Sequence, residues 1–217
     1  SMPSFEKIMH YVPDLFTRTM KDGTNFLLYW FKISFLLVPE MWGRNGSTEI
    51  VRWLISQTDD LTRTNDLGQN VLHCCVMLIH HLDLNRDGWR EDEPFLYQMI
   101  GSTENQLNES LVNARDICGM TPAHLMLFFN QPVLHKIGLS EEFKQEITMK
   151  DQRCLGDFFK VGLKSEEPDE HGATLVHYAA GTGMFGSLEE ILKHCEGSAI
   201  NQRDKHGSTP LHYAVFA

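Results

Sequence analysis

One short motif recurs in phase along most of this sequence, and it constrains the fold more than any other feature. The clearest copy is Gly207-Ser-Thr-Pro-Leu-His-Tyr-Ala214, and Gly119-Met-Thr-Pro-Ala-His124 repeats it. Weaker copies are Gly172-Ala-Thr-Leu-Val-His-Tyr-Ala-Ala180, Gly68-Gln-Asn-Val-Leu-His73 and Gly23-Thr-Asn-Phe-Leu-Leu28. A motif that returns in this way is typical of stacked, similar supersecondary units.

Each copy contains the residue types that begin a helix. A threonine or asparagine stands where an N-cap is favoured, and Pro122 and Pro210 follow at the first helical position, where a missing N–H costs nothing. The glycine before each cap suits a tight turn with positive φ. Each unit is therefore predicted to contain a turn, a helix, a connection and a second helix. The predicted caps are Asn25, Asn70, Thr121, Thr174 and Thr209.

The motif resembles the ankyrin repeat, whose pattern is D-x-x-G-x-T-P-L-H-x-A-A followed by a second helix of the type E-I-V-x-x-L-L. Residues 48–55 and 188–192 resemble that second helix. The resemblance implies an all-α fold, an ankyrin-repeat solenoid of helix–turn–helix units with inserted helices or loops. We expect one domain over residues 2–217, with an N-terminal capping helix at residues 4–19. The units are expected to start near residues 20, 65, 116, 169 and 204.

The spacing of the units departs from the family. The motif glycines at positions 23, 68, 119, 172 and 207 are 45, 51, 53 and 35 residues apart, whereas ankyrin units repeat about every 33 residues. We expect the extra residues between the helices or after the second helix, and we predict an extra helix at Ser140–Ile147. Since the chain stops inside the first helix of the fifth unit, that unit is expected to be truncated and the chain to be a fragment of a longer protein.

The resemblance implies a protein–protein interaction module rather than an enzyme. In that family the concave groove and the turn tips bind partners, unless the insertions fold back over the groove. A substrate-recruiting N-terminal arm of a larger enzyme, or of a secreted bacterial effector acting in a host cell, is the alternative. The resemblance places these partner-binding residues on the surface: Met77, Leu78, Phe128, Phe129, Glu170, His171, Tyr178, Lys205, His206 and Tyr213. It adds Asn65, Asp66, Ile117 and Cys118 at the tips, and Thr182 in the groove.

Charge and composition exclude several classes of protein. With 19 Lys and Arg against 29 Asp and Glu, the net charge of −10 disfavours nucleic-acid binding and favours a partner with a neutral or basic surface. The most apolar segment, residues 26–42, contains Lys32, Pro39 and Glu40 and is too short to span a membrane. Five cysteines without a C-x-x-C pair favour a reducing compartment, the cytoplasm or a host cytoplasm.

No metal or cofactor is expected. The motif histidines are structural in the ankyrin family, where they form hydrogen bonds within and between repeats; here they are His73, His124, His177 and His212. The group formed by His73, Cys74, Cys75, His80 and His81 resembles a zinc cluster, but one helix cannot direct all of them to one ion. Residues 181–186 match the dinucleotide fingerprint G-x-G-x-x-G but follow a predicted helix rather than a strand, which indicates a loop.

One acidic segment resembles part of a calcium site. Asp83-Leu-Asn85-Arg-Asp87-Gly88 matches the first half of an EF-hand loop, including the turn glycine. The twelfth position, which should be a bidentate glutamate, is Pro94. The segment is therefore predicted to bind calcium weakly at best.

Overall fold

The computed structural model describes residues 11, 20–21, 24–25, 28–29, 55–56, 58, 60–76, 107–134 and 141–216. The chain divides into two compact units, residues 1–107 and 108–217, and each is described separately. The described residues form helices joined by turns, and apart from the bridge residue Asn25 none of them lies in a β-strand. Among these residues, no helix combines the length and the apolar character needed to cross a bilayer. Of the predicted capping helix only Tyr11 is described, as helical.

In the first unit the best described segment is a turn followed by a helix. The side chain of Asn65 closes the turn, because its Oδ1 accepts hydrogen bonds from the N–H groups of Leu67 and Gln69 at 3.0 and 2.9 Å. Residues 71–76 are helical and all of them are buried. Turn and helix therefore follow the order that the motif predicts at this copy.

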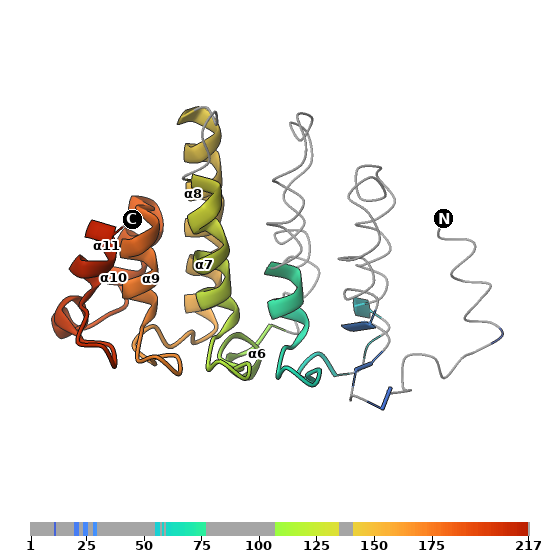
Figure 1. The fold of residues 1–217 in the computed structure, drawn as a ribbon. Helices are drawn as coiled ribbons and strands as arrows, with labels where there is room; N and C mark the ends of the chain where they lie inside the picture. Colours follow the sequence, from blue (N-terminus) through green and yellow to red (C-terminus); the bar gives the residue numbers. More distant parts are fainter. Residues whose placement is uncertain are drawn as a thin grey trace. The chain divides into compact units, whose positions relative to one another are not determined.

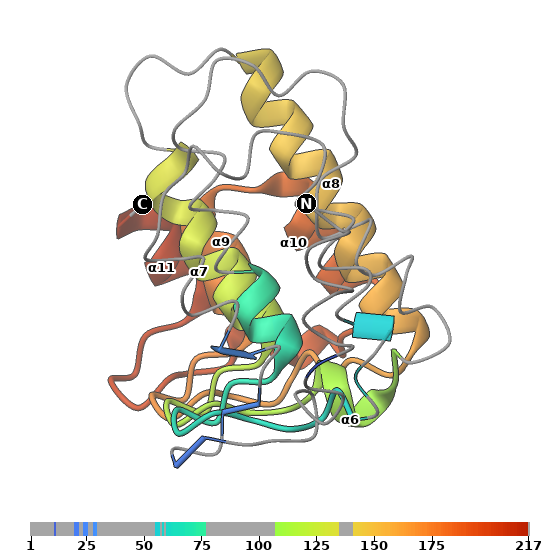
Figure 2. The same ribbon diagram turned by 90° about the vertical axis from the view of Figure 1, so that its right-hand side faces the viewer.

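The described residues of the second unit form seven helical elements, and five of these elements make up two layers. In chain order they are α6 (Glu109–Val112), α7 (Pro122–Leu134), α8 (Glu141–Lys160), α9 (Leu175–Thr182), α10 (Phe185–Leu192), the 3₁₀ helix η2 (Gly197–Asn201) and α11 (Pro210–Phe216). Helix α9 packs between α7 and α11, and α8 packs against α10 (Figure 1). Figure 2 shows α7, α9 and α11 in one layer and α8 with α10 in the other.

Apolar residues at helical spacing form the core of this unit. In α8 the fully buried positions are Cys154, Leu155 and Phe158, which lie on one face of the helix. They lie in the layer that α8 forms with α10, where Ile191 is fully buried. On α9, Leu175, Val176 and Ala179 are equally inaccessible. Burial of such side chains supplies most of the stabilisation, at roughly 25 cal/mol per Å² of apolar surface.

The helices explain how the chain accommodates its longest interval between motif glycines. Helices α7 and α8 contain 13 and 20 residues, whereas α9 and α10 contain 8 each. A helix is present at the predicted position Ser140–Ile147, but it is longer than predicted: residues 141–147 are the first turns of α8, the next described helix after α7. Longer helices thus take up added residues, because each added turn satisfies its own backbone hydrogen bonds.

Three turns of the second unit share one hydrogen-bond pattern, which is also the pattern at Asn65. An Asp Oδ1 accepts from the N–H groups two and four residues later, at 2.8–2.9 Å, in the turns that begin at Asp116, Asp169 and Asp204. The glycine three residues after each aspartate donates to that aspartate's carbonyl oxygen. These glycines, Gly119, Gly172 and Gly207, have φ of 73°, 84° and 80°, a region that other residues rarely adopt.

Successive turns are joined directly through their backbones. Glu170 N–H donates to Cys118 O at 3.0 Å, and Lys205 N–H donates to His171 O at 2.8 Å. A Cβ on Gly119 would lie 2.8 Å from Glu170 N, and one on Gly172 would lie 2.9 Å from Lys205 N. Both glycines are therefore required for the approach of the next turn as well as for their own φ.

Alanine at these glycines should separate the two requirements. Gly207→Ala has only the cost of positive φ, about 1–2 kcal/mol, because nothing lies closer than 4.0 Å to its Cβ position. Gly172→Ala adds a backbone clash, so we expect a distinctly larger loss in the free energy of unfolding. Urea unfolding of both variants measures the difference. Equal losses would show that the turns do not approach each other this closely.

A second stability test concerns Ser187 on α10. Its hydroxyl is fully buried, and the described part of the chain offers it no hydrogen-bond partner, so Ser187→Ala should raise the free energy of unfolding by about 1 kcal/mol. Thr182→Val is the control. The buried Thr182 hydroxyl donates to Ala179 O at 2.9 Å, so its loss should destabilise the fold. Calorimetric melting that ranks both variants below the parent protein would contradict the assignment for Ser187.

Candidate protein-binding surface

The turn tips present side chains on a backbone that several hydrogen bonds hold in place. The two residues between Asp and Gly form each tip: Ile117 and Cys118, Glu170 and His171, then Lys205 and His206. Ile117 is 63% exposed, Cys118 is half-buried, and the other four are exposed. The sequence predicted these six positions as tips, and the structure places them there. Held turns lose little freedom on binding, which favours affinity.

Two tyrosines join the helices to the turns. Tyr178 OH donates to Asp169 Oδ2 at 2.7 Å, and Tyr213 OH donates to Asp204 Oδ2 at 3.0 Å. Burial and the adjoining carboxylates raise the pKa of both phenols, that of Tyr213 to about 12. The sequence predicted both tyrosines as partner-binding residues. Their rings are half-buried, and their hydroxyls form hydrogen bonds within the fold. Only the remaining ring surface is available to a partner.

The carboxylate of Asp204 shows the electrostatic side of this arrangement. Burial acts to raise its pKa, but the N–H groups of Ser208 and His206 and the Tyr213 hydroxyl donate to the charged form. The outcome is a pKa below its ordinary value. The carboxylate therefore stays ionised and keeps the turn closed at neutral pH.

An aromatic cluster lies where α7 packs against α9. Phe128 is 46% exposed. Its ring meets Phe129 edge-on, with centroids 5.5 Å apart, and Tyr178 at 6.4 Å. Edge-on packing holds these rings in place. We refer to Phe128, Phe129 and Tyr178 as the aromatic cluster.

The motif histidines act within the fold. In the second unit Nδ1 of His124, His177 and His212 lies 2.8–2.9 Å from the hydroxyl of the threonine three residues earlier. His177 is buried, and its Nε2 lies 3.3 Å from Ser208 O in the next turn. This requires a neutral ring, in which Nδ1 accepts from Thr174 N–H and Nε2–H donates to Ser208 O. Burial is the main reason that its pKa is lowered.

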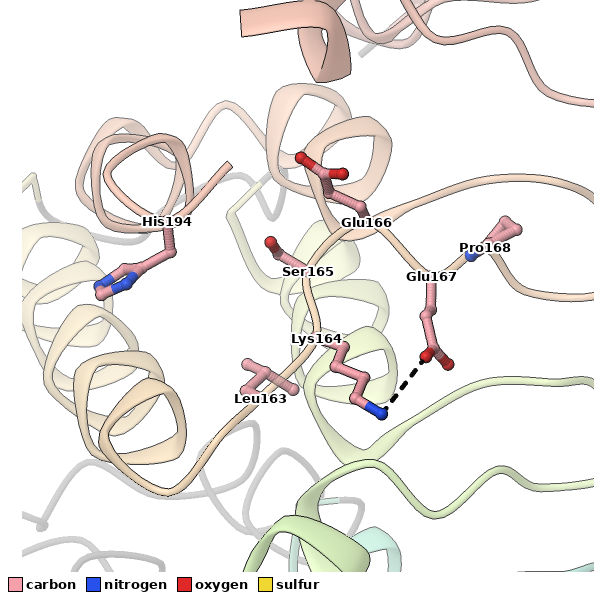
Figure 3. A pocket seen from close by; sticks show the side chains of 7 residues that line it. All are labelled: Leu163, Lys164, Ser165, Glu166, Glu167, Pro168 and His194. Carbon is pink, nitrogen blue, oxygen red and sulfur yellow. Dashed lines mark ion pairs between the residues drawn. The ribbon is translucent and has the colours of Figure 1, made fainter. Parts of the chain in front are cut away.

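A cavity of about 440 Å³ opens between the segment before the Asp169 turn and the end of α10 (Figure 3). The charged side chains around the cavity pair with one another. Lys164 Nζ lies 3.2 Å from the Glu109 carboxylate and 3.8 Å from the Glu167 carboxylate. The Glu167 carboxylate also lies 3.5 Å from the Arg115 guanidinium. The sequence could not indicate the Lys164–Glu109 and Arg115–Glu167 pairs, because they join residues far apart in the chain. The lining residues are Leu163, Lys164, Ser165, Glu166, Glu167, Pro168 and His194.

The thiol beside this cavity is not prepared for nucleophilic chemistry. Cys195 Sγ–H donates to Ser165 Oγ at 3.1 Å, and burial raises its pKa. The ring of His194 stacks on Phe159 with centroids 4.0 Å apart, and its Nε2 lies 3.6 Å from Glu190. No described contact joins the thiol to a base. A catalytic cysteine needs a lowered pKa and a positioned base.

Several predicted positions are corrected or lie outside the described residues. The prediction that Thr182 lies on the groove surface is wrong, because this residue is only 3% exposed. Residues 181–186 close α9, where Gly183 has φ of 68°, and open α10, so a helix precedes them. Within the described ranges no three His, Cys, Asp or Glu side chains converge on a metal position. Met77, Leu78, His80, His81 and the Asp83–Gly88 segment lie outside the described residues.

The comparisons with known proteins add no relative. No protein-family model matches the sequence, and no curated protein matches it.

The buried histidine predicts how stability depends on pH. The pKa of His177 is lower in the folded chain than the 6.5 of an exposed histidine, so below pH 6.5 the unfolded state binds more protons. We therefore expect the free energy of unfolding to decrease as the pH falls from 6.5, because protonated Nδ1 can no longer accept from Thr174 N–H. His177→Gln should weaken this decrease, as measured by urea unfolding between pH 5 and 8. A parent protein equally stable at pH 5.5 and 7.5 would contradict the assignment.

Proposed function

We propose that the chain is an ankyrin-repeat protein that binds another protein through its turn tips and through the exposed face of its first helices. The observation that carries this proposal is the recurrence of one local geometry. The Asp-closed turn, the positive-φ glycine and the threonine–histidine contact return at residues 116–124, 169–177 and 204–212. Residues 65–73 repeat the turn with asparagine in place of aspartate and pair His73 with Asn70.

The packing of the second unit supports the solenoid part of the proposal. Helices α7, α9 and α11 follow the three turns and pack in sequence, each against the next. The backbone hydrogen bond between turns is the same at both junctions. Each turn and the helix that follows it thus contact the next turn and helix in the same way, as a quasi-one-dimensional stack of repeats requires.

The aromatic cluster supports binding as the activity. A half-exposed phenylalanine packed edge-on against two other rings is a rigid apolar anchor, the kind of side chain that dominates interface energetics. Because Phe129 and Tyr178 cover only part of Phe128, its exposed part remains available to a partner.

The chemistry of the chain indicates the kind of partner and compartment. A net charge of −10 favours association with a neutral or basic surface and slows encounters with acidic ones. All five cysteines are free thiols, which supports a reducing compartment such as a cytoplasm.

Aspartate in place of the exposed phenylalanine tests the proposal. Phe128→Asp should cost little stability, because the side chain reaches solvent, but it should reduce capture of the partner at least tenfold. Immobilised parent and variant chains are incubated with cell extract, and the captured proteins are compared by quantitative mass spectrometry alongside thermal melts.

Met149→Asp is the matched control. Met149 is apolar and 70% exposed on α8, in the other helix layer, so its substitution should leave both capture and melting unchanged. A partner captured equally by all three proteins would contradict the aromatic cluster as the binding surface. A large fall in the melting temperature of Phe128→Asp would show that Phe128 belongs to the core.

A further inference from the structure

We infer that the first residues of the three tips, Ile117, Glu170 and Lys205, together recognise a polyproline II segment with an apolar, a basic and an acidic side chain at every third position. We refer to these three residues as the tip row. The inference rests on the proposed function and specifies the chemistry of the partner. The three residues occupy equivalent positions in hydrogen-bonded successive turns, so the row presents one side chain per turn.

The tip row carries charges that the fold itself does not use. No ion pair or hydrogen bond engages the Lys205 ammonium within the part of the chain that the structure describes. The Glu170 carboxylate has one described charged neighbour, the Nε2 of His171 at 3.5 Å, which attracts it only when that ring is protonated. Ile117 is 63% exposed. By contrast Lys164 and Glu167, near the same turns, already have partners.

The hydrogen bonds set an upper limit on the spacing of the row. Within one turn Asp169 N–H bonds to Ala173 O at 2.9 Å, so its two arms lie one strand spacing apart. Lys205 N–H bonds to His171 O, which places the next turn one further spacing away. Two spacings of about 4.8 Å give a repeat of at most about 10 Å and a row at most about 19 Å long.

This repeat selects the conformation of the bound segment. Polyproline II has three residues per turn and a rise of about 3.1 Å, so every third side chain lies on one face about 9 Å further on, and three of them span about 19 Å. In a β-strand, residues three apart point to opposite faces. In an α-helix, side chains seven residues apart lie on the same face about 10.5 Å from each other, so three of them span about 21 Å. Polyproline II also loses little entropy on binding.

Charge complementarity orders the side chains of the segment. A basic residue must face Glu170, an acidic residue must face Lys205, and an apolar residue must face Ile117. Reversal of the two charged positions places like charges together at both tips, which is unfavourable. The row therefore discriminates between two peptides of identical composition.

Two synthetic peptides test the inference. Each has twelve residues, all proline except at positions 3, 6 and 9, which are Leu, Arg and Glu in one peptide and Leu, Glu and Arg in the other. Because a peptide can bind in either chain direction, each peptide is also made with its sequence reversed. In fluorescence anisotropy at low salt, the full chain should bind a Leu-Arg-Glu peptide about three- to tenfold more tightly than its charge-reversed counterpart.

A double variant of the chain provides the decisive comparison. Glu170→Lys with Lys205→Glu should invert the preference between the peptides and leave the melting temperature unchanged, because both side chains are exposed. Phe128→Asp should not alter it. Equal affinity for all peptides, no measurable binding at millimolar concentration, or an unchanged preference in the double variant would overturn the inference. So would tighter binding of a helical peptide with the same side chains seven residues apart. Failure here leaves partner capture through Phe128 intact, so the two proposals are tested separately.

Discussion

The structure depends on a single local interaction, the closure of a five-residue turn by one carboxylate or amide oxygen. Asp169 Oδ1 takes the N–H groups of His171 and Ala173, which leaves His171 O directed to the next turn. Because the turn is fixed, the threonine after it can cap a helix and the histidine can lock that cap. The helix layer is thereby positioned from its first residue.

The same interactions determine which side-chain groups pack within the fold and which remain exposed. The phenols of Tyr178 and Tyr213 are used by the turn carboxylates, and their rings pack edge-on against His124 and His177 with centroids 5.5 and 5.1 Å apart. The first residue of each tip and part of Phe128 remain exposed to solvent. A surface supported in this way is rigid, and rigid anchors bind with a small entropic loss.

The irregular spacing of the units is absorbed without disturbing the turns. Helix α7 runs away from the Asp116 turn, and helix α8 runs back towards the Asp169 turn. Added residues at the far ends of the helices leave the junction between turns unchanged, since both Glu170 N–H and Lys205 N–H form the equivalent bond. The solenoid proposed above would tolerate such variation, because each repeat of a solenoid contacts only its neighbours.

The sequence alone determined the local structure: the caps at Thr121, Thr174 and Thr209, the prolines at the first helical position, the turn glycines, the tip residues and the histidines at the caps. These features arise from contacts within five residues, so residue type and spacing are sufficient to predict them. The tertiary structure decided the rest. It buried Thr182, directed two tyrosine hydroxyls into the turns, made residues 141–147 the beginning of α8, and formed the cavity beside His194 from residues about 30 positions apart. These outcomes depend on which helix packs against which, and residue periodicity does not contain that information.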